Sequence, residues 1–272
     1  MHTQKVRTRF NLLREAWQLA RERFPAAAPL PEKLDSRAVE AQLHATILEM
    51  VGACITLFEH GNYWPMPVLL RVAHEALAEQ LALERDPTYL KDMVATTLEE
   101  GRSLPEHINQ QQRGLLQAFL AEPGARDFLG RIKDSAAEVA TDGGEHVDIQ
   151  KKFERAGLEN EYPLHRMLGG SVHNDLGALQ QRHAERAADG TKRLALFRVP
   201  SELDLLNSLD SALASLLRSY RSFHRGAGEL QPFIDKFAEH LREERGAGPR
   251  RLSQLDRYVG TRESRSTRPR HR

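Results

Sequence analysis

The sequence predicts an all-α protein: a multi-helix bundle of about nine or ten helices, with a short non-helical insertion near residues 186–200 and a disordered basic tail. Two observations support this prediction. The composition is rich in Ala, Leu, Glu, Arg and Gln and has only 6% aromatic residues, which favours helix over sheet. Apolar residues also recur every three or four positions along much of the chain, which is the period of an amphipathic helix.

The first two helices are delimited by proline, glycine and good capping residues. An apolar stripe from Phe10 to Ala20 indicates a first helix, which Pro25 ends. A second helix of about 24 residues begins at Asp35 or Ser36, because short polar side chains cap helix N-termini, and Gly61 ends it.

The third predicted helix, residues 68–85, is the most apolar in the chain. Pro65 and Pro67 suit its first turn, and its apolar residues wrap most of its circumference. We therefore expect a central helix that packs on several sides. Arg71, His74 and Glu75 share its remaining arc.

The rest of the chain predicts shorter helices and one more long one. A break at residues 141–144 precedes the second half, in which residues 192–199 are the only β-like stretch and are too short to define a sheet. The expected helices cover residues 88–101, 105–121, 126–139, 146–156, 162–183 with an interruption at Gly169 and Gly170, 201–226 with Ser201 as the N-cap, and 230–245.

These elements predict a single helical domain over residues 1–245, divisible into sub-halves 1–140 and 145–245, followed by the Arg-rich tail 246–272. The tail holds eight arginines and two acidic residues, a net charge of +6, so the formal total of +1 leaves −5 for residues 1–245. A basic tail on an acidic body either serves as a solubilising end or contacts nucleic acid weakly.

Several classes of protein are disfavoured by residues that are missing. Cys54 is the only cysteine and lies in an apolar stretch, so we expect a small core residue rather than a disulfide or a nucleophile. No run of eighteen apolar residues occurs, and charges through residues 1–24 exclude a signal peptide. We expect a cytoplasmic protein with no membrane contact, no cofactor and no metal, since phosphate-loop, dinucleotide, hydrolase and zinc-protease signatures are absent.

Two features could carry chemistry. Arg71 and Glu75 are four residues apart and so meet on one helical face, where the apolar surroundings favour either a structural clasp or a site. His165 and His173 are eight residues apart, which lacks the pairing at i and i+4 of a helical zinc site.

The two segments together resemble a known family. The stretch that contains Arg71 and Glu75, followed about ninety residues later by the run from Arg166 through Leu168 to His173, is similar to the bacterial helical family catalogued as domain-of-unknown-function family 5677. The resemblance covers roughly residues 40–225. This sequence has His165 where the family pattern has Tyr, and Gly169 where it has Ser. The resemblance implies a helical bundle with an Arg, Glu and His cluster and brings no activity with it.

More distantly, the chain resembles the HEPN superfamily, whose ribonuclease members use an Arg followed by four to six residues and a His. With 31 arginines and 12 histidines, about four such spacings arise by chance. Five occur, so the motif alone decides little. They are Arg37 with His44, Arg102 with His107, Arg166 with His173, Arg218 with His224, and Arg265 with His271.

Two functions therefore stay open. The first is an interaction or sensing module, for example of a mobile-element or phage-defence system, with an unknown protein partner. The second is a HEPN-like metal-independent ribonuclease or toxin that acts on RNA. The candidate catalytic residues are Arg71, Glu75, Arg166 and His173, with a neutral His173 as the base that deprotonates a ribose hydroxyl and an Arg that stabilises the phosphorane charge.

Overall fold

The computed structural model describes residues 2–24, 35–107, 142–172, 176–186, 190–194 and 198–245, with the single positions 130 and 134. Most of the predicted helices over residues 105–121 and 126–139, and all of the basic tail 246–272, lie outside the described residues.

Within the described residues the fold is all-α, as predicted. The helices and strands are α1 (Gln4–Arg23), α2 (Ser36–Glu59), α3 (Met66–Arg85), α4 (Tyr89–His107), α7 (Ile149–Ala156), α8 (Tyr162–Val172), α9 (Leu176–His183), β1 (Ala184–Arg186), β2 (Lys192–Leu194), α10 (Glu202–Phe223), a 3-10 turn (Gly228–Leu230) and α11 (Gln231–Arg245).

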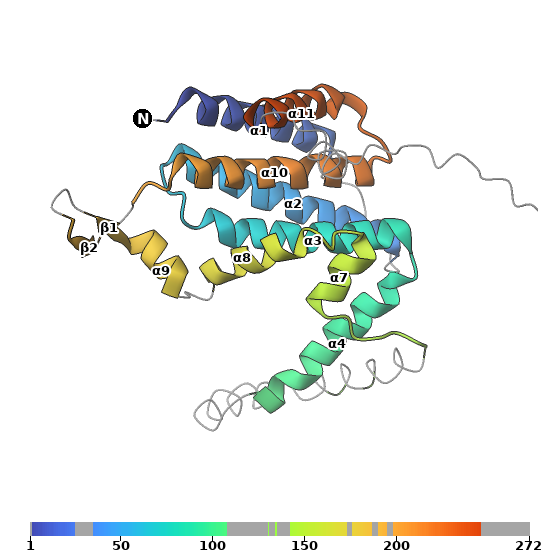
Figure 1. The fold of residues 1–272 in the computed structure, drawn as a ribbon. Coiled ribbons are helices and arrows are strands. Elements are labelled where there is room, and N and C mark those ends of the chain that lie inside the picture. The colour runs from blue at the N-terminus through green and yellow to red at the C-terminus, as the bar shows by residue number, and fades with distance from the viewer. Residues whose placement is uncertain are drawn as a thin grey trace, which may run out of the picture.

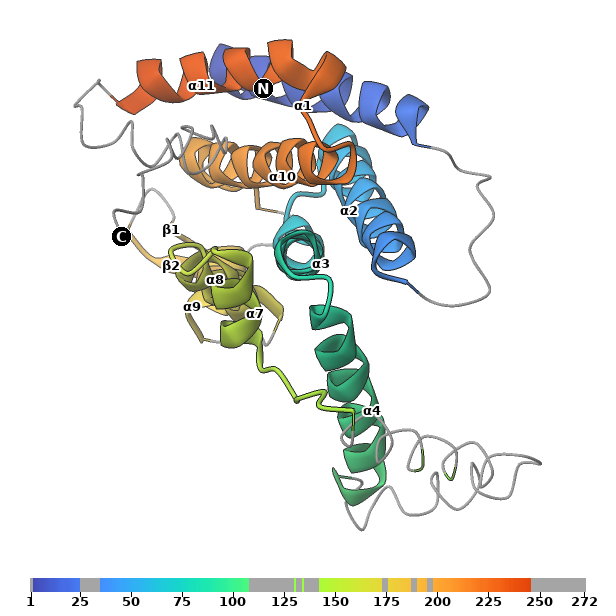
Figure 2. The same ribbon diagram turned by 90° about the vertical axis from the view of Figure 1, so that its right-hand side faces the viewer.

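The helices form layers with α3 at the centre (Figure 1). α1 and α11 lie side by side in one outer layer, α10 and α2 lie beneath them, and α3, α8 and α7 lie on the other side of α10 and α2 (Figure 2). α3 contacts α2, α7, α8 and α10, which confirms the predicted central helix packed on several sides. One continuous core of buried apolar residues draws on α1, α2, α3, α7, α8, α10 and α11.

Local capping explains why the long helices begin where they do. The side chain of Asp35 accepts a hydrogen bond from the backbone N–H of Ala38 at 2.7 Å, so α2 starts at the predicted position. Ser201 and Asp204 form a reciprocal capping box at the start of α10.

α2 is long and apolar enough to cross a membrane if length and composition alone are considered, with a mean hydropathy of 1.4. However, its side chains pack in the core against α3 and α10, and Ile47, Val51 and Cys54 are fully buried. A helix buried in a protein core can be equally long and apolar, so the length and hydropathy of α2 are weak evidence for a membrane span.

Two predicted helix breaks are wrong. α4 continues through Gly101 and Pro105 to His107, and α8 continues through Gly169 and Gly170 to Val172. A single glycine costs a helix only about 1 kcal/mol relative to alanine, and the tertiary packing of α8 against α3 outweighs that cost.

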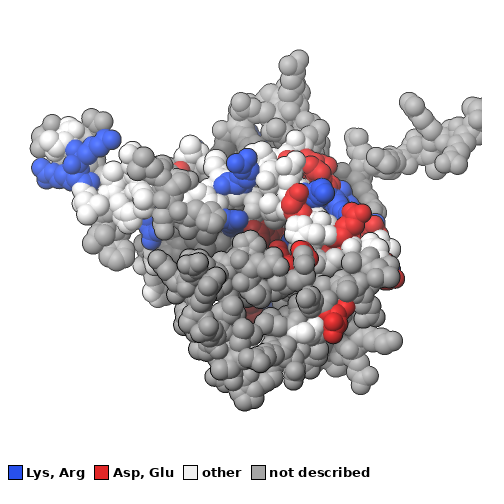
Figure 3. Space-filling model, turned by 90° about the horizontal axis from the view of Figure 1, so that it is seen from below, with Lys and Arg blue, Asp and Glu red and all other residues white. Residues whose placement is uncertain are grey.

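The β-like stretch forms a small sheet after all. β2 pairs antiparallel with β1, with Glu185 opposite Arg193, whereas the sequence alone suggested a stretch too short for a sheet. Lys192, Arg193 and Leu194 of β2 are all exposed. Figure 3 shows basic side chains gathered at the end of the molecule where this hairpin projects.

Candidate functional site

The predicted Arg71–Glu75 pair forms on α3, with Nε of Arg71 3.3 Å from Oε1 of Glu75. The two side chains are 26% and 38% exposed, so the pair is partly buried at the edge of the bundle. A pair at this exposure contributes little net stability, because solvent screens it and both long side chains lose freedom.

The histidine that joins this pair is His165 of α8. Its Nε2 lies 3.3 Å from Oε1 of Glu75, and its side chain is only 2% exposed. Burial, and then the nearby Arg71 guanidinium, lower the pKa of His165 to about 4. The Glu75 carboxylate favours the charged ring, but Glu75 is already paired with Arg71, so burial prevails and the imidazole is neutral at pH 7.

Gly169 allows α8 to approach this cluster. A Cβ at position 169 would lie 3.1 Å from Nη1 of Arg71, which is closer than ordinary contacts. The absence of a side chain at position 169 therefore leaves room for the Arg71 guanidinium, and the same residue was the predicted helix break.

The remaining predicted site residues are not brought into this cluster by the described structure. Arg166 follows His165 on α8 and is exposed to solvent. His173 lies outside the described residues. Among the Arg and His spacings, Arg218 and His224 have separate contacts: Nη1 of Arg218 binds Oε1 of Glu161 at 2.5 Å, while His224 is the C-cap of α10 and its ring lies against that of Tyr220.

Near the cluster, a groove runs between α8 and α10, and we call it the α8/α10 groove. It consists of two adjoining cavities of about 250 Å³ each. The first lies toward α11 and the second toward the start of α10. Four residues line both cavities and join them into one channel: Leu164, Met167, Asn207 and Ser211.

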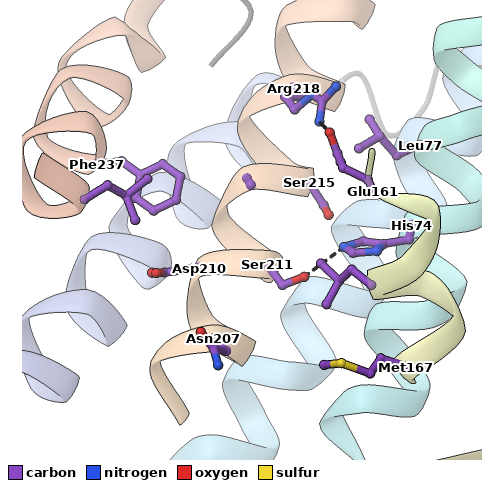
Figure 4. A pocket seen from close by; sticks show the side chains of 13 residues that line it. His74, Leu77, Glu161, Met167, Asn207, Asp210, Ser211, Ser215, Arg218 and Phe237 are labelled. Carbon is purple, nitrogen blue, oxygen red and sulfur yellow. Dashed lines mark hydrogen bonds and ion pairs between the residues drawn. The ribbon is translucent and has the colours of Figure 1, made fainter. Parts of the chain in front are cut away.

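The walls of the groove combine apolar side chains with a few polar groups. Leu77 of α3, Leu164 and Met167 of α8, and Phe237 and Leu241 of α11 supply apolar surface to the first cavity. Met167 stands at the mouth and is 73% exposed. Figure 4 shows α10 presenting a polar row to this space, with Asn207, Ser211, Ser215 and Arg218 along it.

His74 of α3 lies at the floor of the groove and is hydrogen-bonded to α10. Its Nε2 lies 2.8 Å from Oγ of Ser211, and its Nδ1 is buried with no hydrogen-bond partner (Figure 4). Burial lowers the pKa of His74 to about 3, with smaller effects of His165 and Arg218. The ring is therefore neutral at every physiological pH.

The buried histidines of the described residues are poorly matched to proton transfer near neutral pH. A general base works best with a pKa near the working pH, but the pKa values of His74 and His165 lie near 3 and 4. The Ser211–His74 pair also has no carboxylate on Nδ1 that would orient the ring as in a nucleophilic triad. Cys54 is buried and its pKa is raised to about 12, which confirms the prediction of a core residue.

Ion pairs join α10 to its neighbours beside the groove. Arg218 of α10 binds Glu161, which directly precedes α8, and both side chains are less than one-fifth exposed. On the other side, the carboxylate of Asp210 pairs with Arg9 of α1, whose side chain is almost fully buried. These pairs fix α10 relative to α8 and α1, so the groove is a preformed feature of the bundle.

Sequence reasoning missed the groove, although one signal for it was readable. Three serines spaced four apart, Ser211, Ser215 and Ser219, lie on the leucine-rich face of α10 and are all buried. Polar residues on such a face need partners: Ser211 pairs with His74 on α3, and Ser219 with His44 on α2. What the spacing could not tell was which helices would supply those partners.

In the described part of the chain, no three His, Cys, Asp or Glu side chains converge as metal ligands would. Nothing in this part therefore points to a metal centre, and the groove is the candidate site.

A family model described as Family of unknown function (DUF5677) matches residues 37–191, more than half of the chain. The match runs from α2 through β1, and so includes the Arg71–Glu75 pair and the α8 wall of the groove. No curated protein and no solved structure matches the chain. The resemblance to HEPN proteins stays a prediction. The chain therefore belongs to the Family of unknown function (DUF5677).

Proposed function

We propose that the protein is a cytoplasmic interaction module whose α8/α10 groove binds an amphipathic helical segment of a partner protein. The observation that carries this proposal is the groove itself, which is open, mostly apolar and preformed. Its buried histidines are neutral hydrogen-bonding groups of the scaffold rather than acids or bases. An apolar concavity with a few convergent polar groups is the usual form of a binding site.

The length of the groove favours a polypeptide over a small molecule. Its lining residues on α10 run from Asp204 to Arg218, a span of fifteen residues and about 21 Å of helix at a rise of 1.5 Å per residue. A helix laid along such a groove would place apolar side chains three or four residues apart into the two cavities. Each cavity is larger than the roughly 150 Å³ that holds a benzene ring in an engineered apolar cavity.

The surface beyond the groove also fits a protein partner. Val199 and Leu203, which flank the lining residue Pro200, are 58% and 65% exposed, and Met167 is 73% exposed. Exposed large apolar residues beside a cavity are typical of interaction surfaces, because a partner buries them on binding.

The test is retention of a partner by tagged full-length chain in cells of its own organism, compared between two charge substitutions. Met167→Asp places a carboxylate at the mouth of both cavities, whereas Val72→Asp makes the same kind of change at an exposed apolar residue of α3 outside the groove. We expect a protein that binds wild type and Val72→Asp but is lost with Met167→Asp. Identical sets of bound proteins for all three would contradict the proposal.

The ribonuclease alternative has a separate readout. Purified wild type and His173→Ala would be incubated with structured and single-stranded RNA, without added metal. We expect intact RNA with both. Cleavage by wild type that His173→Ala abolishes would replace the interaction module with an RNA-cleaving enzyme.

A further inference from the structure

α11 leads the chain directly to the α8/α10 groove. Phe237 and Leu241 of this helix line the first cavity, and α11 runs antiparallel to α10, so that it ends toward the start of α10 (Figure 1). The second cavity, with Asp204 and Leu205 in its lining, lies at that end of α10. Residues 246–272 therefore continue from a point beside the groove.

The sequence that follows α11 contains an amphipathic segment. After a Gly-Ala-Gly-Pro linker at residues 246–249, the apolar residues are Leu252, Leu255, Tyr258 and Val259. At 100° per residue these four lie within an arc of about 120°. Arg250 and Arg257 fall outside this arc and Arg251 is the one charged residue within it, so a helix here would have a largely apolar face. A four-residue linker can span about 14 Å, enough to cross from the end of α11 to the neighbouring groove.

The charges of the segment are opposite to those at the start of α10. The segment carries Arg250, Arg251 and Arg257. The start of α10 carries Glu202 and Asp204, both in its first turn, whereas Asp210 in the first cavity is already paired with Arg9. Opposite charges at the two sides would orient the segment along the groove, as in other electrostatically matched interfaces.

We propose that residues 250–260 of this chain fold into a short helix that docks in the α8/α10 groove and competes there with the partner. This inference rests on the proposed function, because it assigns a regulatory occupant to the same groove. The leucines fill the two cavities and the arginines face the acidic start of α10. An isolated helix of this length is marginal in water, so the segment gains its helix from docking.

The effect of the docked segment on partner affinity can be calculated. A segment tethered by a short flexible linker has an effective concentration in the millimolar range. If the free segment bound with a dissociation constant of about 0.1 mM, the groove would be occupied roughly nine-tenths of the time, which weakens partner binding about tenfold.

Contact quenching in the full-length chain tests the docking. A bimane dye is attached at Met167→Cys in a chain that also carries Trp64→Phe, because Trp64 lines the same cavity as Met167 and its indole would quench the dye in every variant. Tyr258→Trp then supplies the quencher within the segment. Cys54 does not compete for the label, because it is buried and its pKa is raised to about 12. We expect at least a twofold loss of emission relative to the labelled chain that retains Tyr258, since quenching requires contact between the dye and the indole.

Two pairs of substitutions in the tail make a matched comparison. Leu252→Ser with Leu255→Ser should restore the emission, whereas Arg268→Ser with Arg270→Ser should leave it quenched. No quenching, or equal quenching in both double variants, would overturn the proposal. Quenching that grows with protein concentration would also overturn it, because a second copy would then supply the segment.

The quenching experiment and the partner-retention experiment test the two proposals separately. If the dye is quenched but no partner depends on Met167, the groove is an intramolecular docking site and the interaction module fails. If a partner depends on Met167 without quenching, the module stands and the tail proposal fails. When both hold, partner binding should tighten about tenfold in the Leu252→Ser and Leu255→Ser variant.

Discussion

Lowering the pH should destabilise this protein steeply between about pH 6 and 4, because three buried histidines are held neutral. Burial lowers the pKa of His44 and His74 to about 3 and that of His165 to about 4. In the unfolded chain a histidine has a pKa near 6.5, so below that pH the unfolded state binds protons that the folded state excludes. Stability is therefore fully present above pH 6.5 and falls as the pH drops toward the folded-state values.

The magnitude follows from that difference in proton binding. Within this window each histidine lowers the free energy of unfolding by about 1.4 kcal/mol for each pH unit of acidification. Between pH 8 and pH 5 this loss amounts to about 2 kcal/mol per histidine. The three together amount to about 6 kcal/mol, a large share of the stability of an ordinary domain.

Urea unfolding followed by circular dichroism at half-unit steps from pH 8 to pH 5 measures this effect. For wild type, the slope of the free energy of unfolding against pH should correspond to nearly three protons taken up on unfolding at pH 5.5. His74→Gln should lower this number by about one, since it removes one titrating group. The interpretation fails if the free energy of unfolding is flat down to pH 5, or if His74→Gln leaves the slope unchanged.

Three further substitutions test the packing that positions the groove. Leu213→Ala, at a fully buried position of α10, should lower the free energy of unfolding by about 3 kcal/mol, whereas Leu203→Ala, 65% exposed, should change it by less than about 0.5 kcal/mol. Gly157→Ala should cost about 1 kcal/mol or more, because its φ is +65°; Gly226→Ala, with open space and no positive φ, is the control. Ser201→Ala should cost about 1 kcal/mol by removing the α10 cap. Thermal or urea denaturation checks all of them, and equal effects within the matched pairs would contradict this description.

Local features of the fold could be predicted from the sequence. The N-cap Asp35 and the stop at Gly61 bracket α2 as expected, and Ser201 begins α10. These features depend on hydrogen bonds and backbone preferences within a few residues, so they are readable from a short stretch of chain.

The errors arose where tertiary packing overrides a local preference. Gly169 was predicted to interrupt a helix, yet α8 passes through it, because the absence of a Cβ admits the Arg71 guanidinium. A pattern of residues along one segment carries no information about which distant side chain will fill the space beside it.

The candidate site was predictable only in part, for the same reason. The Arg71–Glu75 pair follows from spacing along one helix, and it forms. The contacts of His165 with Glu75 and of His74 with Ser211 join residues 90 and 137 positions apart, so they depend on how whole helices pack. Family resemblance directed attention to His173, while the described structure places His165 beside Glu75.

The central claim, that the α8/α10 groove receives a helical segment, is tested most directly by site-specific photo-crosslinking from position 167. A photoreactive amino acid would replace Met167 at the mouth of the groove, and Val72 on α3 as the control, in full-length chain inside its own cells. We predict crosslinks from position 167, and not from position 72, to a peptide with apolar residues three or four apart, whether from a partner or from residues 250–260. Crosslinks from both positions to the same scattered set of proteins, or none from position 167, would contradict the claim.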